Sequence, residues 1–290
     1  MSRGRNSLLC WIKAVRKKIM NDSPVLTWLE GRTGILSFNR PHVMNAFDSA
    51  LISATNAAMA ELLSDDRVLA IIVHGEGRCF SAGFDMKESA AKNINGAKAW
   101  REVLTTDFDF IMQFWDSPKP TIAAAHGFCI AGAMEVLMAC DLAVASKETV
   151  MGEPEVRFGS GIVAMLAPYV TGPKQAKELL LTGNDRISAQ RCYEMGLINR
   201  VTPEGQALEE ALMLAHQITS ASAPSVQLTK RAINRTYELA NMRKGLAEAL
   251  EIDVGIESDM SPERLEFNRI RKDENLKAAL AWRDKQSPGD

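Results

Sequence analysis

The chain has 290 residues, 46% of them hydrophobic, and a formal net charge of -2 at pH 7. This length allows one large domain, or a domain with a helical extension, around a substantial core. Because the surface is not basic overall, nucleic acid and anionic membrane are not the expected partners. No apolar run of about 18 residues occurs, so we expect a soluble protein without a membrane span.

The five cysteines are widely spaced, odd in number and without a CxxC or Cys/His metal pattern. They therefore predict a reducing compartment, with neither a disulfide framework nor a metal site. Residues 1–20 hold six basic and no acidic residues, and we expect a disordered basic extension there. A cytoplasmic location follows, with the mitochondrial matrix as the alternative if residues 1–20 are a transit peptide.

Short buried strands alternate with helices in the first two thirds of the chain, which predicts an α/β core over residues 21–203 with mostly parallel pairing. The expected strands are 25–31, 34–40, 68–77 and 141–146, with a strand and turn over 120–130, and the expected helices are 48–63, 97–116 and 132–140. After Pro203 only helical patterns remain: 205–220, 224–239, 242–257, 262–271 and 275–283. Residues 204–290 are therefore predicted to be a helical subdomain, whose apolar faces favour oligomerisation.

The segment 126–141 places a helix start at Gly132 directly after a glycine-flanked turn. The first N–H groups of a helix have no intrahelical partner, so a negative oxygen can bind there. Glu135 follows one turn later among apolar residues, where a carboxyl is costly unless it is used or paired. The alternative is that Glu135 only complements the helix dipole.

Two further segments add donors and acids. In 75–88, a small-residue turn precedes Phe84, whose N–H can face the same oxygen as that of Gly132; two such donors make an oxyanion hole. A plain tight turn is the alternative, and no nucleotide-binding motif is present. In 151–161, two acids flank Pro154, which fixes the direction of Glu155. A loop surface charge is the alternative for Glu155.

Together, in this order, these segments resemble the crotonase superfamily, also called the enoyl-CoA hydratase/isomerase family. The similarity covers about residues 24–284 and is carried by LSFNRPHVMNAFD (36–48), FSAGFDMKE (80–88), the Gly132 helix, EPEVRFG (153–159) and LTGNDRISAQRCYEMGLINRV (181–201). The resemblance implies a spiral of strand-strand-helix units with a C-terminal helical subdomain. It also implies a homotrimer or a dimer of trimers.

By this resemblance, Glu135 and Glu155 match the two catalytic glutamates, and the N–H groups of Phe84 and Gly132 bind the thioester oxygen. Coenzyme A is expected along two segments, the first with Met44, Asn45 and Ala46 and the second with Ala82, Asp85, Met86 and Lys87. Lys87 is equally well explained as a solvated surface lysine. Coenzyme A enters as part of the substrate, and no cofactor or metal is implied.

The implied reaction is the reversible addition of water to a trans-2-enoyl-CoA, with Glu135 as base on the water and Glu155 as proton donor to the α carbon. The sequence departs from the family pattern at Gly161-Ile162-Val163-Ala164, where a Pro-Gly-Gly-like turn is usual, and at Phe84, where alanine is frequent. Isomerase or lyase chemistry on an acyl-CoA therefore stays open. A non-catalytic protein that binds CoA or RNA is also an open alternative. Its only support is the basic segment 1–20.

Overall fold

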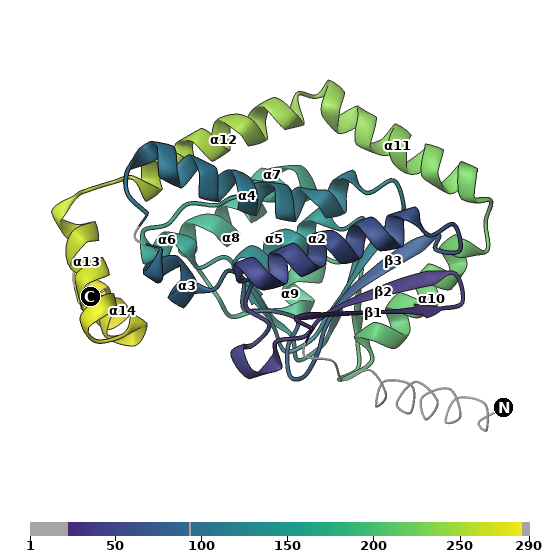
Figure 1. The fold of residues 1–290 in the computed structure, drawn as a ribbon, viewed down its shortest axis with the longest axis horizontal. Helices are drawn as coiled ribbons and strands as arrows, with labels where there is room; N and C mark the ends of the chain where they lie inside the picture. Colours follow the sequence, from purple (N-terminus) through teal and green to yellow (C-terminus); the bar gives the residue numbers. More distant parts are fainter. Residues whose placement is uncertain (1–22, 93, 286–290) are drawn as a thin grey trace.

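The computed structural model describes residues 23–92 and 94–285, and a twisted six-stranded sheet forms its centre (Figure 1). The strand order is β1-β2-β3-β4-β6-β9, in which β1 pairs antiparallel with β2 and every other pair is parallel. The strands are β1 (Val25–Glu30), β2 (Thr33–Phe38), β3 (Ala70–Gly75), β4 (Thr121–Ala125), β6 (Leu142–Ser146) and β9 (Arg200–Thr202). The prediction of a mostly parallel α/β core is confirmed.

A second, three-stranded sheet was not predicted from the sequence, and it positions the candidate site. It contains β5 (Phe128–Ile130), β7 (Val150–Gly152) and β8 (Ile187–Ser188). β5 and β7 are parallel, with Ile130 opposite Gly152. The segments that follow them, which begin α5 and carry Glu155, therefore start side by side although about 20 residues separate them in the chain.

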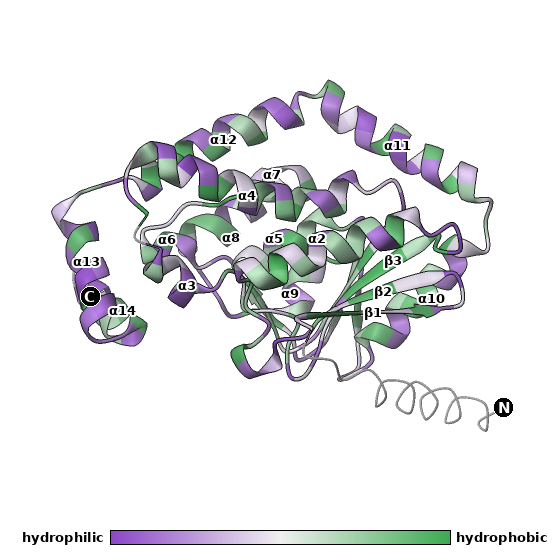
Figure 2. Cartoon of the chain, in the orientation of Figure 1, coloured by the Kyte–Doolittle hydropathy of each residue, from purple (hydrophilic) through white to green (hydrophobic). Residues whose placement is uncertain are grey.

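Helices cover both faces of the large sheet. On one face lie α2 (Ser49–Ser64), α4 (Gly96–Asp116) and α5 (Gly132–Ala139). On the other, α10 (Ala207–Thr219) packs Ala211 and Leu214 against Ile35, Ile72 and Ile122 of the strands. Figure 2 shows β3 in hydrophobic green, in keeping with its burial between helices on the two faces of the sheet. Thus α10 completes the core, although it follows the expected boundary at residue 203.

The remaining C-terminal helices are α11 (Ala223–Leu239), α12 (Met242–Glu257), α13 (Pro262–Asp273) and α14 (Leu276–Asp284). α12 packs along α4, whereas α11 buries only Lys230, which donates to Asp141 and to the carbonyl of Lys119. α13 and α14 form a small separate hydrophobic cluster around Phe267 and Ile270. They lie at the opposite end of the molecule from α11 (Figure 1).

Shorter elements complete the described chain: η1 (Pro41–Val43), α3 (Met86–Ala91), α6 (Glu155–Phe158), α7 (Ala167–Val170), α8 (Pro173–Thr182) and α9 (Ala189–Glu194). Across the described ranges, no helix combines the length and the apolar character needed to cross a bilayer. The predicted basic extension, residues 1–20, lies outside the described residues.

Candidate active site

The loop before Phe84 lies directly against the start of α5. Phe47 holds this loop through two backbone hydrogen bonds: its N–H donates to the carbonyl of Gly83 at 2.8 Å, and its carbonyl accepts from the N–H of Asp85 at 3.0 Å. Gly83 has φ +81°, and a Cβ there would lie 3.0 Å from the nitrogen of Gly132. Only glycine allows two backbones to approach this closely.

The two predicted oxyanion donors therefore sit on touching segments. Within the described residues, neither the N–H of Phe84 nor that of Gly132 donates to another protein group. Gly132 is the first residue of α5, so its N–H has no carbonyl of the helix to donate to. The helical hydrogen bonds begin at the carbonyl of Ala131, which accepts from the N–H groups of Met134 and Glu135. Both N–H groups keep their donor capacity for a ligand, as an oxyanion hole requires. The binding of an oxygen there stays a prediction.

Three glutamates meet beside these donors. Glu135, one turn into α5, is 1% exposed, and its Oε2 accepts from the N–H of Ala164 at 2.5 Å. Glu155 opens α6, and Glu153, two residues earlier, is 0% exposed. Carboxylate oxygens from all three lie within 4.8 Å of one another. The structure thus brings the two predicted acids together and adds a third, to which the sequence interpretation gave no role.

The environment favours the protonated form of these acids. Burial, followed by the charge of Glu155, raises the pKa of Glu135 well above its ordinary value, although the N–H of Ala164 opposes the shift. Burial and the charges of Glu155 and Glu135 likewise raise the pKa of Glu153. For Glu155, burial raises the pKa to about 7, against a lowering hydrogen bond from Glu153. Groups this close titrate together, so the protons leave the cluster in coupled steps.

Among the described residues, this cluster is also the one set of acidic, histidine or cysteine side chains whose ligand atoms are close enough to surround an ion. All three acids have raised pKa values, so protons compete with a cation for the same oxygens. We therefore interpret the cluster as an acid–base group. Such a group, beside backbone donors for an oxyanion, suits addition or removal of protons next to a thioester carbonyl.

Comparison with known proteins identifies the family. The sequence model of the enoyl-CoA hydratase/isomerase family matches residues 31–261. The chain belongs to this family. It is 33% identical to a probable enoyl-CoA hydratase of Rhizobium meliloti over 81% of this chain and 88% of that protein. It is 34% identical to a probable mitochondrial enoyl-CoA hydratase of Dictyostelium discoideum, over 72% and 75% of the two chains.

A solved structure agrees with this assignment. The crystal structure of an enoyl-CoA hydratase/isomerase from Xanthobacter autotrophicus Py2 superimposes with a TM-score of 0.88 at 43% identity, covering 93% of this chain and 100% of that one. The fold predicted from the resemblance, a crotonase-like spiral with a C-terminal helical part, is confirmed.

In this family member, the two segments predicted for coenzyme A are neighbours. The N–H of Ala82 donates to the carbonyl of Met44 at 3.0 Å. The side chain of Asn45 is fully buried and fully used, since its amide donates to the carbonyls of Glu76, Cys79 and Phe80 while its oxygen accepts from the N–H of Arg40. Asn45 therefore ties two loops together, and only backbone near it is available for a ligand.

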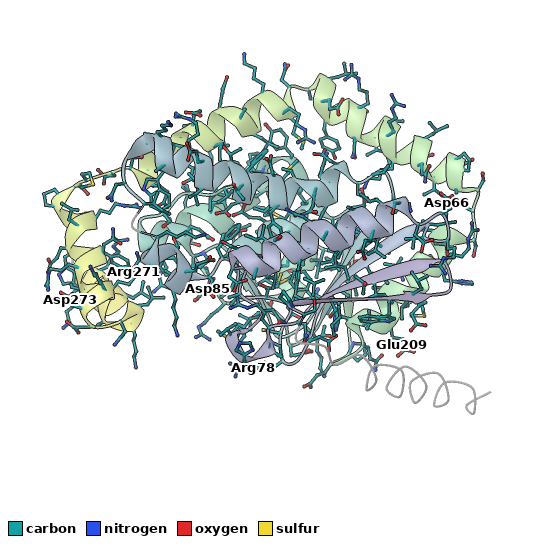
Figure 3. The ribbon with its side chains drawn as sticks, in the orientation of Figure 1. Asp66, Arg78, Asp85, Glu209, Arg271 and Asp273 are labelled. Carbon is teal, nitrogen blue, oxygen red and sulfur yellow. The ribbon has the colours of Figure 1, made fainter. Side chains whose placement is uncertain are left out.

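The other predicted coenzyme A residues lie around the start of α3. Asp85 caps this helix by accepting from the N–H groups of Lys87 and Glu88 (Figure 3). Met86 is partly buried, and the side chain of Lys87 is exposed. Contact with coenzyme A stays a prediction for all seven residues: Met44, Asn45, Ala46, Ala82, Asp85, Met86 and Lys87.

Arg40 was missed by the sequence interpretation, and it joins these segments. Its guanidinium lies 2.8 Å from Asp48 and 3.3 Å from Asp85, and it donates to the carbonyl of Ala46 at 2.5 Å. The side chain is only 17% exposed, so these ion pairs are partly shielded from water. The LSFNRP motif could have indicated this residue, because it places Arg40 directly before the predicted ligand loop.

A fourth acid reaches the site from the C-terminal helices. Asp253 of α12 is 2% exposed and lies so close to Gly161 that a Cβ there would be 2.1 Å from its Oδ1. Burial, with the charges of Glu257 and Glu155, raises the pKa of Asp253 to about 7. The unusual turn at 161–164 therefore accommodates an acid from α12 and supplies the N–H of Ala164 to Glu135.

α4 packs against α5, and its Trp100 and Trp115 are partly buried against the main core. His74 and His126 stack on each other with ring centroids 4.9 Å apart, and each contacts a backbone carbonyl. These contacts indicate a structural role for both rings, and neither belongs to the acidic cluster.

Proposed function

We propose that this protein catalyses the reversible addition of water to a trans-2-enoyl-CoA. The observation that carries the proposal is the meeting of the buried Glu135 and the half-buried Glu155 beside backbone N–H groups that have no protein acceptor within the described residues. Membership of the family and the names of relatives as enoyl-CoA hydratases support it. Coenzyme A enters as part of the substrate, and the chemistry calls on no other cofactor and no metal.

In the proposed step, one glutamate gains a proton and the other loses one. The thioester oxygen accepts from the N–H groups of Phe84 and Gly132, which stabilise the negative charge that develops on it. One ionised glutamate takes a proton from water while the water oxygen bonds to the β carbon, and the other glutamate delivers its proton to the α carbon. The pKa of about 7 at Glu155 favours Glu155 as the ionised member in the resting site, the reverse of the roles expected from the sequence.

The test follows the loss of enoyl-thioester absorbance with crotonoyl-CoA and with a longer trans-2-enoyl-CoA. Wild type is compared with Glu135→Gln and Glu155→Gln, and Glu204→Gln, an exposed glutamate outside the cluster, is the matched control. We expect each site substitution to lower kcat by about 10²–10⁴-fold and the control to leave it unchanged. Circular dichroism and thermal unfolding check that each variant is folded.

Three results decide among the alternatives. Turnover of a 3-enoyl-CoA without water addition would establish an isomerase instead. Binding of acyl-CoA without any turnover, equal in wild type and both Gln variants, would indicate a non-catalytic binding protein. RNA affinity at low salt that disappears on deletion of residues 1–19 would support the nucleic-acid alternative.

We also propose a homotrimer or a dimer of trimers. Large hydrophobic side chains are exposed along α11 and α12, namely Leu228 (61%), Ile233 (54%), Leu239 (69%) and Ile252 (66%). A second copy of the chain would bury this surface. Light scattering measures the state, and a monomer at micromolar concentration would contradict it. The proposed location is the cytoplasm, with the mitochondrial matrix as the alternative, and imaging of the chain with and without residues 1–20 distinguishes them.

A further inference from the structure

Glu153 lies between β7 and Pro154 and is the most enclosed member of the acidic cluster. Its side chain is 0% exposed, and within the described residues no group donates a hydrogen bond to either carboxyl oxygen. An ionised carboxylate in such a place would cost several kcal/mol. A neutral, protonated Glu153 avoids this cost, since its O–H can then donate.

The acceptor for that proton is Glu155. A hydrogen bond from a protonated Glu153 can reach it, because carboxyl oxygens of the two residues lie within 4.8 Å of each other and Oε2 of Glu155 receives no donor from the described chain. The bond strengthens when Glu155 is ionised, because a hydrogen bond to a charged acceptor is stronger than a neutral one. Glu135, in contrast, has the N–H of Ala164 as its fixed donor. Each glutamate of the proposed pair thus has its own hydrogen-bond donor, the N–H of Ala164 for Glu135 and a protonated Glu153 for Glu155.

We propose that Glu153 is a positioning residue that holds a proton against Glu155, keeps Glu155 ionised in the resting site, and leaves its other oxygen directed at the substrate water. The proposal rests on the proposed hydratase function. It assigns a role to a third carboxyl that does not itself exchange a proton with the substrate. The buried cluster then keeps one negative charge rather than three.

Other titratable groups face Glu153 and enter the test. They are Glu135 on α5, Glu155 on α6 and the thiol of Cys129 on β5, with Asp253 of α12 beyond Glu155. Burial keeps the pKa of the Cys129 thiol well above its ordinary value, so this group stays neutral. The charge that Glu153 meets near neutral pH therefore comes from the glutamates.

Two substitutions test whether Glu153 acts as a hydrogen-bond donor or only fills space. Glu153→Gln keeps a donor, because its amide N–H can replace the carboxyl O–H, whereas Glu153→Leu fills the space without one. In the Leu variant we expect the limb of the pH–kcat profile that Glu155 sets to move up by roughly one to two pH units. We expect the Gln variant to return this limb toward the wild-type position and to restore most of the lost rate.

The direction of the shift is decisive. If Glu153 is ionised in the resting site, both substitutions remove a negative charge and move the limb to lower pH, which overturns the proposal. Equal loss of rate in both variants with an unmoved limb would mean a purely structural role and would overturn it as well. So would stoichiometric binding of Mg²⁺ or Mn²⁺ by wild type that is abolished in Glu153→Gln, since a cation would then replace the proton.

One measurement needs no turnover and separates this proposal from the hydratase assignment. An infrared difference spectrum of wild type minus Glu153→Gln at neutral pH should contain the carbonyl band of a protonated carboxylic acid. A carboxylate band in its place would refute the proton on Glu153 whatever the reaction is. With the protonated band present and no hydration of any enoyl-CoA, the hydratase function fails alone.

Discussion

Gly132→Ala should disable the oxyanion hole through a steric contact that the structure defines. A Cβ on Gly132 would lie 2.5 Å from the nearest ring atom of Phe84, and ordinary contact begins at 3.4 Å. Ring and backbone must therefore separate by about 0.9 Å. Both residues carry the proposed donors, and a misplacement of about 1 Å in a catalytic geometry typically costs about 10²-fold. We expect kcat for crotonoyl-CoA hydration to fall by about this factor.

Removal of the ring tests this reasoning. In Phe84→Ala/Gly132→Ala the obstacle is gone while both N–H groups remain, so at least tenfold of the lost rate should return relative to Gly132→Ala alone. Gly255→Ala is the matched control, because nothing lies within 4 Å of a Cβ there and a helical alanine is favoured by about 1 kcal/mol. Full activity of Gly132→Ala, or a double variant as slow as the single one, would refute the steric argument.

Three further predictions concern neighbouring residues. Ala131 has φ +58° and ψ -143°, a conformation that suits glycine, so Ala131→Gly should raise the free energy of unfolding by about 1 kcal/mol in urea titration; a loss would contradict the strain. Burial raises the pKa of Asp253 to about 7, so the stability gained by its protonation is complete below about pH 4 and is lost as the pH rises through 7. Asp253→Asn does not lose this stability, so between pH 4 and pH 8 its free energy of unfolding should rise by about 4 kcal/mol relative to that of wild type. Equal pH dependence of urea unfolding in the two proteins would show that this acid is not coupled to folding. Arg40→Met should raise KM for enoyl-CoA about tenfold with little change in kcat, because it releases Asp85 and the 44–47 loop; the exposed Arg67→Met is the control, and a change in kcat alone would exclude a binding role.

Much of the fold follows from patterns within single segments. The alternation of apolar strands and helices predicted β1 to β4, α2, α4 and α5 with ends within a few residues of those observed, because those segments bury continuous apolar runs or one helical face. The small sheet was missed because its strands have two or three residues each, too few for any period to be visible. It is this sheet, however, that sets Gly132 beside the segment of Glu155.

The site was predictable where a residue belongs to a local motif. Glu135 and Glu155 were found from a helix start and a proline-stiffened segment, and the structure places both in one acidic cluster. Glu153 carries the same local signal as Glu155, but a sequence does not reveal which of two neighbouring acids faces inward. Asp253 gives no signal at all, since it is one charge on an amphipathic helix almost 100 residues after Glu155.

The C-terminal helices therefore do more than cover the core. Arg264 of α13 donates to the carbonyl of Gly159 and pairs with Glu257 of α12, and Arg283 of α14 donates to the carbonyl of Arg157 at 2.7 Å. Together with Asp253 against Gly161, these contacts hold the segment that carries Glu155 from outside, while Glu135 holds its far end through Ala164. Because burial sets the protonation of the cluster, any movement of α12 to α14 that admits water would lower the pKa of Glu155 and change the number of protons available at the site.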